Sequence, residues 1–106
     1  MSSQTEQIRA LNDQLRQKLS TGVAVITTGV AALGPQAVDR IVQTISVFDD
    51  FCHANDPHQE HDFGSFQAEG EAIFFKIDLY EEPDVKNPNG EPIASRVLTI
   101  MLAEEY

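Results

Sequence analysis

The chain has 106 residues, of which 42% are hydrophobic, so it is long enough to bury one core, and we expect a single acidic domain over residues 1–106. Its single cysteine excludes an internal disulfide framework and is typical of a protein of the reducing cytoplasm. A net charge of −10 with seven lysines and arginines disfavours direct binding of nucleic acid or of an anionic membrane. The first apolar segment, residues 23–33, is too short to span a bilayer.

The charge is unevenly distributed along the chain. Residues 1–47 contain four cations and three carboxylates, a net charge of +1, whereas residues 48–106 contain three cations and fourteen carboxylates, a net charge of −11. A surface with such an excess of carboxylates attracts basic partners, and it also keeps a small protein in solution. We therefore expect the second part to be either a docking surface for a basic protein or simply a solvated face.

The first part of the chain predicts a helix, a strand and a second helix. The first helix is amphipathic, with Arg16 among the polar residues of its outer side. Residues 23–28 are mostly apolar and β-branched, which indicates a buried strand. Residues 29–34 are a predicted turn, and Pro35 suits the first position of the second helix. The expected core residues are Ile8, Leu11, Leu15 and Leu19 in the first helix and Val38, Ile41, Val42, Ile45 and Phe48 in the second.

The second part of the chain predicts three strands. Residues 63–68 and 72–80 are separated by a tight turn at Gly70, which predicts a hairpin. Residues 81–92 contain three prolines and are predicted to be an acidic loop. Residues 96–102 are almost continuously apolar, which favours a central strand beside the hairpin, although a buried helix fits the pattern as well.

The order αβαβββ predicts an α+β fold with a mostly antiparallel four-stranded sheet and two helices packed on one face. The hairpin and the last strand form a predicted meander. The place of the first strand in the sheet stays open at this point.

All three histidines and the cysteine lie within residues 52–61, between the helical and the β patterns. The segment His58-Gln59-Glu60-His61 differs from the zinc motif HExxH, but a loop can still gather such side chains around zinc or another divalent ion. The alternative is that the histidines hydrogen-bond nearby carboxylates and tie the loop to the sheet. The candidate metal ligands are His53, His58, His61 and Asp62.

Two other motifs are incomplete. Residues 29–34 lie between a strand and a helix, as a phosphate-binding loop does, but Pro35 stands where that loop needs its lysine. Cys52 and His53 are neighbours and would point about 100° apart on a helix, so they cannot pair there as nucleophile and base. A small buried cysteine at the end of the second helix is the expected arrangement. Asp49 and Asp50 follow the same helix, where a nearby cation would offset their unfavourable position at the negative end of the dipole.

Three segments form a distinctive combination, namely residues 55–64 (NDPHQEHDFG), residues 75–78 (FKID) and residues 96–106 (RVLTIMLAEEY). This combination resembles a small bacterial family of unknown function whose members are often encoded on plasmids and other mobile elements. The resemblance extends over nearly the whole chain from Ile8. It implies a bacterial, cytoplasmic, single-domain protein, and it supplies no activity or catalytic residues.

We expect a non-enzymatic acidic protein that binds a basic protein partner without a cofactor. Small acidic proteins from mobile elements can imitate DNA and block nucleic-acid-binding defence proteins, and carboxylates on one face of a strand recur every ~7 Å. The alternative is a metal-binding module or a metal-dependent hydrolase that uses the candidate metal ligands. An obligate oligomer whose exposed phenylalanines and leucines form the interface is a third possibility. The predicted partner contacts are Asp78, Glu81, Glu82, Asp84, Glu91, Glu104 and Glu105.

Overall fold

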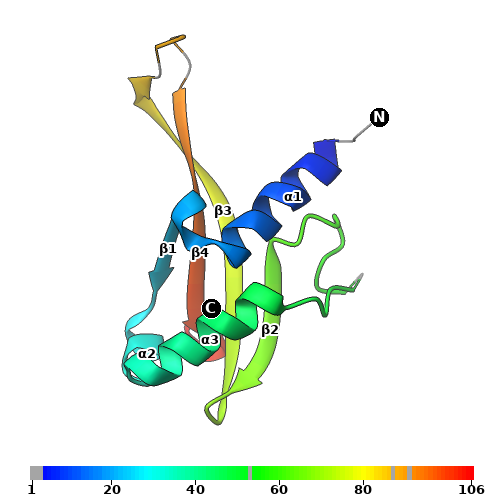
Figure 1. Ribbon diagram of the computed structural model, residues 1–106, viewed down its shortest axis with the longest axis vertical. Helices are drawn as coiled ribbons and strands as arrows, with labels where there is room; N and C mark the ends of the chain where they lie inside the picture. The colour runs from blue at the N-terminus through cyan, green and yellow to red at the C-terminus, as the bar shows by residue number, and fades with distance from the viewer. Residues whose placement is uncertain (1–3, 53, 87, 91) are drawn as a thin grey trace.

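The computed structural model describes residues 4–52, 54–86, 88–90 and 92–106, with the backbone alone for residues 82–85 and 92–94. Figure 1 shows the arrangement of the helices and strands. In chain order, the elements are α1 (Gln4–Gln17), the 3-10 helix η1 (Leu19–Thr21), β1 (Val23–Ile26), α2 (Thr28–Ala31), α3 (Pro35–Val47), β2 (Phe63–Ala68), β3 (Glu71–Lys86), β4 (Pro92–Leu102) and the 3-10 helix η2 (Ala103–Glu105).

The four strands form one mixed sheet in the order β1-β4-β3-β2. β2, β3 and β4 are antiparallel neighbours, so the predicted meander is confirmed. β1 pairs in parallel with β4, with Val23 opposite Val97 and Ile26 opposite Ile100. The sheet is therefore mostly but not fully antiparallel, and the first strand lies at its edge beside the last one. The prediction of a buried strand at residues 23–28 is wrong, because all four residues of β1 are exposed at this edge.

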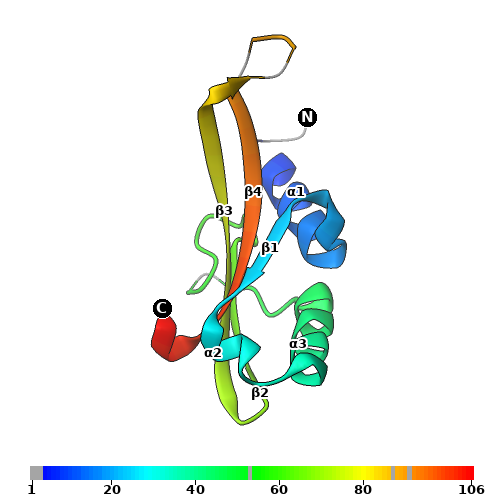
Figure 2. The ribbon, with the colours of Figure 1, turned by 90° about the vertical axis from the view of Figure 1, so that its left-hand side faces the viewer.

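Helices α1 and α3 cover the same face of the sheet, as expected (Figure 2). The strands alternate accordingly, and Ile73, Phe75 and Ile77 of β3 point to the helices and are buried. On the opposite face, Tyr106 packs its ring edge-on against Phe63 and Phe74. The buried core consists of Leu15, Val30, Ile41, Ile45, Ile73, Phe75, Ile77, Leu98, Ile100 and Leu102.

The turn between β2 and β3 has the predicted form. Glu69 and Gly70 have φ angles of 57° and 75°, which are the left-handed values that a two-residue hairpin turn requires. The Glu69 carboxylate accepts a hydrogen bond from Nε of Arg40 in α3 at 2.6 Å, and this bond lowers the pKa of Glu69. The exposed ion pair links the turn to the helix layer.

The prediction of an acidic loop at residues 81–92 is wrong for most of this range, because β3 extends to Lys86 and β4 starts at Pro92. The pairing of β3 with β4 continues outward through Glu81 opposite Ala94 and Glu82 opposite Ile93, and it resumes at Lys86 opposite Pro92 after an irregularity. Pro92 is tolerated because it occupies the first position of its strand, where a missing N–H costs little. We call residues 81–94 the arm. Its described residues, 81–86, 88–90 and 92–94, extend past both helices, and the molecule is 47 Å long (Figure 1).

Two predictions about the first helices are also wrong. Leu11, expected in the core, is 47% exposed, whereas Arg16, expected on the outer side, is 4% exposed. The buried side of α1 is therefore rotated toward Asn12 and Arg16, which find polar partners beneath the helix. Part of the predicted turn at residues 29–34 is the short helix α2, which Thr27 caps by accepting a hydrogen bond from the backbone N–H of Val30.

Within the described residues, no helix is both long enough and apolar enough to cross a lipid bilayer.

Candidate functional site

The candidate site is built on the histidine loop, residues 48–62, which connects α3 to β2. The buried carboxylate of Asp56 organises this loop, because its Oδ1 accepts hydrogen bonds from the backbone N–H of Glu60 at 3.0 Å and of His61 at 3.1 Å. His61 has a φ of 56°, an unusual value for a residue other than glycine. The loop thus turns sharply at His61 before it enters β2.

The His61 ring is held on three sides. It stacks on Phe51, with ring centroids 3.9 Å apart and planes inclined by 4°. Its Nδ1 lies 2.8 Å from Oδ1 of Asp13 in α1, and its Nε2 lies 3.7 Å from Oδ2 of Asp56. The contact with Asp13 is within hydrogen-bonding distance, whereas that with Asp56 is too long for a hydrogen bond. His61 therefore fastens the loop to α1.

Arg16 lies at the centre of the same contacts and is buried. Its guanidinium donates to the backbone carbonyls of Ile45 at 2.8 Å and Phe48 at 2.9 Å at the end of α3, and the Ile45 carbonyl also accepts the N–H of Phe48. It also donates to Asp13 at 2.7 Å and lies 5.1 Å from the centroid of the Phe51 ring. Arg16 is thus the cation expected at the negative end of the second helix.

Two further side chains of α1 hold the loop through its backbone. Asn12, which is buried, donates from Nδ2 to the carbonyl of Glu60 at 2.9 Å. The exposed guanidinium of Arg9 donates to the carbonyl of Gln59 at 3.2 Å. Consequently, polar contacts join α1 to the histidine loop beside the apolar core.

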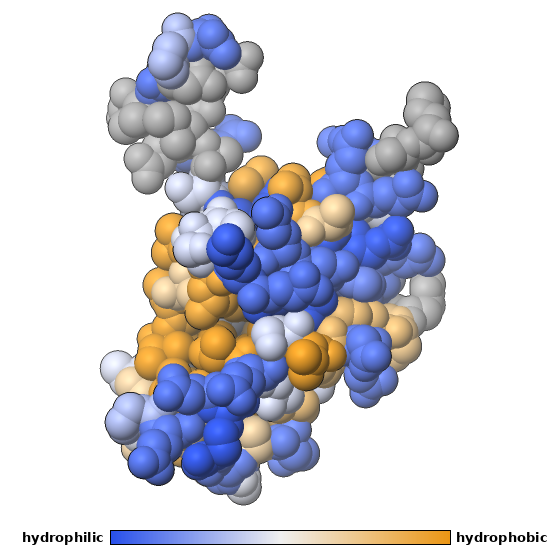
Figure 3. All heavy atoms as spheres, in the orientation of Figure 1, coloured by the Kyte–Doolittle hydropathy of each residue, from blue (hydrophilic) through white to orange (hydrophobic). Residues whose placement is uncertain are grey.

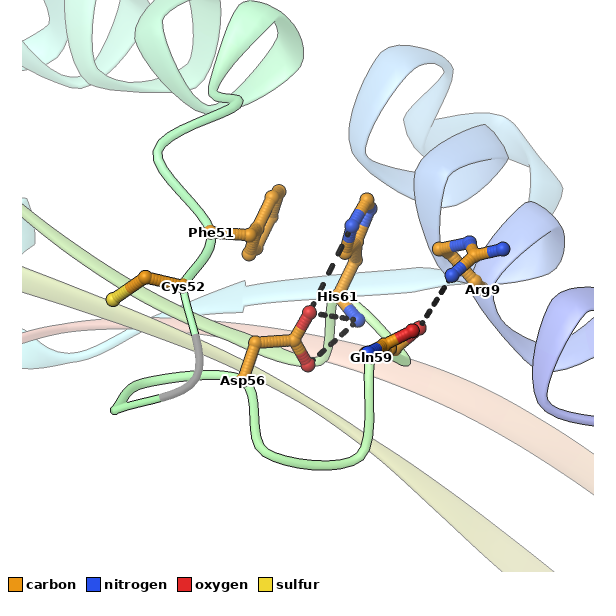
Figure 4. A pocket seen from close by; sticks show the side chains of 6 residues that line it. All are labelled: Arg9, Phe51, Cys52, Asp56, Gln59 and His61. Carbon is orange, nitrogen blue, oxygen red and sulfur yellow. Dashed lines mark hydrogen bonds and ion pairs between the residues drawn. The ribbon is translucent and has the colours of Figure 1, made fainter.

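A pocket of about 270 Å³ opens between these parts (Figure 4). Cys52 is exposed, contrary to the expectation of a buried cysteine, and Figure 4 shows its side chain directed away from His61. The thiol and the imidazole therefore do not form a nucleophile and base pair. The residues that line the pocket are Arg9, Phe51, Cys52, Asp56, Gln59 and His61.

The predicted metal ligands are not brought together where the structure describes them. His58 is exposed, His61 is engaged by two aspartates, and the backbone carbonyl of Asp62 accepts a hydrogen bond from Ile77. His53 lies outside the described residues. Among the described residues, no three His, Cys, Asp or Glu side chains are grouped as a metal ion would require.

The predicted partner contacts lie on two parts of the fold. Asp78 is 41% exposed beside Lys76, with 3.5 Å between the charged atoms, and Glu81 is exposed at the start of the arm. Glu82 and Asp84 belong to β3, but their side chains, like the whole of Glu91, are outside the described part. Figure 1 shows that the arm lies far from η2, where Glu104 and Glu105 are found.

Glu105 has partners within the fold. Its Oε1 accepts hydrogen bonds from the Thr27 hydroxyl at 2.5 Å and from the backbone N–H of Leu102 at 2.8 Å, and its Oε2 accepts one from the N–H of Gly29 at 3.1 Å. The Thr27 hydroxyl contributes most to lowering the pKa of this carboxyl. Glu105 therefore joins the end of β4 to the start of α2, whereas its neighbour Glu104 is exposed.

The role of α1 in this site was not predicted from the sequence. Asn12 and Arg16 are spaced by four residues and share one side of the helix with Leu15, so their position on an apolar stripe was a usable signal. The contact between Asp13 and His61 could not be recognised from a sequence pattern, because the two residues are 48 positions apart.

Comparison with known proteins agrees with the resemblance seen in the sequence. Residues 26–105 match the family described as "Protein of unknown function (DUF3768)". The match starts at Ile26, so it covers the whole sheet apart from residues 23–25. It leaves out α1, although the resemblance was expected to start at Ile8 within that helix. Neither a curated protein nor a solved structure gave a match. The chain therefore belongs to the DUF3768 family of proteins of unknown function.

Proposed function

We propose that the protein is a non-enzymatic binding protein that docks its acidic arm on a basic surface of another protein. The observation that carries this proposal is the extension of β3 and β4 past α1 and α3 (Figure 2). The arm contains four carboxylates, Glu81, Glu82, Asp84 and Glu91, and one cation, Lys86. A feature that adds little to the core but concentrates negative charge is suited to an intermolecular contact.

The backbone geometry of the arm supports this proposal. Paired strands hold successive side chains on alternating faces, and residues on one face recur every ~7 Å. Because the backbone of the arm is already paired over part of its length, little further backbone entropy is lost when it binds a partner. Asp78, at the base of the arm and partly exposed, extends the same negative surface toward the body of the molecule.

We propose further that the partner is a nucleic-acid-binding protein and that the arm occupies its DNA-binding surface. Duplex DNA presents one phosphate charge per ~1.7 Å of its axis, so proteins that bind it carry basic grooves into which a narrow acidic arm fits. This proposal fits a protein that is encoded on a mobile element and acts in the bacterial cytoplasm, with a host defence protein as its target.

The histidine loop does not favour an enzymatic alternative. In the described residues that line its pocket, the imidazole of His61 is held by carboxylates and the thiol of Cys52 points elsewhere. The contacts of His61 stabilise the loop, and the Cys52 thiol has no base beside it to activate it as a nucleophile.

The test is reversal of the arm charges. The protein is immobilised, incubated at low ionic strength with a lysate of its bacterial host, and the captured protein is identified and purified. We expect this partner to bind the wild type with an affinity that falls as salt rises, and to be displaced by duplex DNA. The triple variant Glu81→Lys, Glu82→Lys, Asp84→Lys should bind at least tenfold more weakly.

A matched control separates the arm from the overall charge. The variant Asp39→Lys, Asp50→Lys, Glu71→Lys changes the net charge by the same amount at exposed positions outside the arm, and we expect it to retain most of the affinity. Equal losses in both variants would show that only net charge matters. Unchanged binding after reversal of the arm would refute the proposal, and failure of DNA to compete would refute the imitation of DNA.

A further inference from the structure

β1 is an outer strand that has almost none of the features that keep sheet edges from pairing. All four of its residues are exposed, and Val23, Val25 and Ile26 are 43%, 43% and 40% exposed. Its sequence, VAVI, contains no charge and no proline, the residues by which proteins commonly protect an edge strand. Figure 3 shows hydrophobic residues gathered on the flank that β1 occupies in Figure 1.

The other outer strand, β2, differs in this respect. Its Gly64 is buried, and Phe63, Phe66 and Ala68 are half-buried. No residue of β2 is among the exposed large hydrophobic residues of the described chain, whereas three of the four residues of β1 are. The two edges are therefore not equivalent, and the apolar one is β1.

The free edge of β1 presents backbone groups in a definite pattern. The N–H of Thr27 donates to the carbonyl of Ile100 in β4 at 3.1 Å. Backbone groups alternate in direction along a strand, so those of Val25 also point to β4, and those of Ala24 and Ile26 point away from the sheet. The outward amides and carbonyls are thus separated by one residue.

This pattern is complementary to itself. When two copies of β1 run antiparallel about a two-fold axis at Val25, Ala24 of one copy lies opposite Ile26 of the other. Each of these two pairs exchanges two hydrogen bonds, which gives four in total. Val25 then faces Val25 of the second copy in a pair without backbone hydrogen bonds, where side chains approach closely.

The charge distribution also indicates a second copy as the occupant. Two molecules of net charge −10 repel each other, and the repulsion is least where their acidic parts lie farthest apart. β1 itself contains no charged residue, so pairing it with a second β1 places no like charges directly opposite each other. A basic peptide would find no opposite charge on this uncharged strand. A second copy of the strand instead finds an apolar strand of the same sequence to pair with.

We propose that β1 is a dimerisation edge, at which two copies of the chain pair their β1 strands antiparallel and continue the sheet from one molecule into the other. The surface is separate from the arm, so this inference does not depend on the proposed function. Because each strand has four residues, the interface is small and the dimer is weak and concentration-dependent. The two-fold axis closes the assembly at two copies.

Sedimentation velocity over a range of protein concentrations tests the proposal. We expect the wild type to change from monomer to dimer as concentration rises, and the dimer to be strengthened by added salt, which screens the repulsion between the copies. Val25→Lys should remain monomeric, since it places two like charges directly opposite each other. Val47→Lys is the matched control, because Val47 is 77% exposed on α3, away from the edge, and should dimerise as the wild type does.

Cross-linking gives a second readout that does not depend on affinity. In a Cys52→Ser background, Val25→Cys should form a disulfide-linked dimer on mild oxidation, because opposite residues in such a pair lie within disulfide distance. Val47→Cys in the same background should not. A wild type that is monomeric at all concentrations, a dimer that persists in Val25→Lys, or equal cross-linking through both cysteines would each overturn the proposal.

Discussion

At the scale of single residues, Arg16 shows how one buried cation can stabilise several elements together. Its guanidinium satisfies two carbonyls at the end of α3, pairs with Asp13 of its own helix and packs against Phe51 of the histidine loop. Removing it takes a buried donor from two carbonyls and from the Asp13 carboxylate at once, which costs more than the loss of a surface ion pair.

We expect Arg16→Ala to lower the free energy of unfolding by about 3 kcal/mol or more. Arg16→Lys should recover only part of this loss, because an ammonium group cannot donate in the forked geometry of a guanidinium. Urea denaturation measures both changes. Arg9→Ala is the control, and the loss of its exposed hydrogen bond to Gln59 should cost less than about 1 kcal/mol. Equal effects at positions 9 and 16 would contradict this role of Arg16.

Glu105 predicts a pH dependence of stability. The Thr27 hydroxyl and two backbone N–H groups bind the ionised carboxylate, so its pKa in the folded state is below its ordinary value. Its contribution to stability is therefore complete above the ordinary carboxyl pKa and is lost as the pH falls through the lowered one. Thermal unfolding at neutral pH should show a lower Tm for Glu105→Gln than for the wild type, and the difference should shrink in acid. Glu104→Gln, at the exposed neighbouring residue, should leave the Tm unchanged both at neutral pH and in acid.

At the scale of elements, the close approach between β2 and the aromatic core depends on the absence of a side chain at Gly64. A Cβ atom there would run into the Phe75 ring and would lie 2.7 Å from Cε1 of Phe48. The two rings meet edge-on, with centroids 5.2 Å apart, and anchor the start of the histidine loop to β3.

Gly64→Ala should therefore destabilise the fold by about 1–3 kcal/mol, the usual cost of overpacking a core. Ser65→Ala, on the exposed face of the same strand, is the matched control and should stay within about 0.5 kcal/mol of the wild type. Chemical denaturation would decide the matter, since a stable Gly64→Ala variant would show that Phe48 and Phe75 can move apart freely.

We expect the fold not to need the arm. Tyr80 lies opposite Ser95, so replacing residues 81–94 by Asn-Gly closes the hairpin with a two-residue turn at that pair. We expect the shortened protein to keep its circular dichroism spectrum and to lose less than about 1 kcal/mol of stability, but to lose partner binding. Unfolding of this variant would mean that the arm supports the core.

The elements also show which parts of the fold the sequence could predict. Local chemistry identified the turn at Gly70, the start of α3 at Pro35 and the apolar alternation of β3, because each depends on neighbouring residues. The arm was missed because prolines and carboxylates suggest a loop unless the pairing strand is known. The contact of His61 with Asp13 depends on how α1 is placed in the finished fold, which no local pattern states.

At the scale of the whole molecule, charge opposes folding. Most of the net charge of −10 belongs to residues 48–106, and compaction brings these carboxylates closer together. Cations of residues 1–47 offset this repulsion in part, as Arg40 does by pairing with Glu69.

Added sodium chloride should therefore raise the Tm between low and moderate ionic strength, because screening the net repulsion outweighs the weakening of a few ion pairs. Neutralising the arm with Glu81→Gln, Glu82→Gln and Asp84→Asn should make this rise smaller. Differential scanning calorimetry over a salt series measures the effect. A Tm that falls with salt would show that the ion pairs dominate.

The parallel pairing of β1 with β4 has a consequence for the order in which the protein forms on the ribosome. Val23 and its neighbours are synthesised early, but their partners, Val97 to Ile100, emerge more than seventy residues later. The β2–β3 hairpin can close during translation, while β1 waits without its neighbour and exposes an apolar strand. Completion of the sheet is therefore a late event, and a nascent chain that stalls before β4 would be the form most exposed to chaperones and to aggregation.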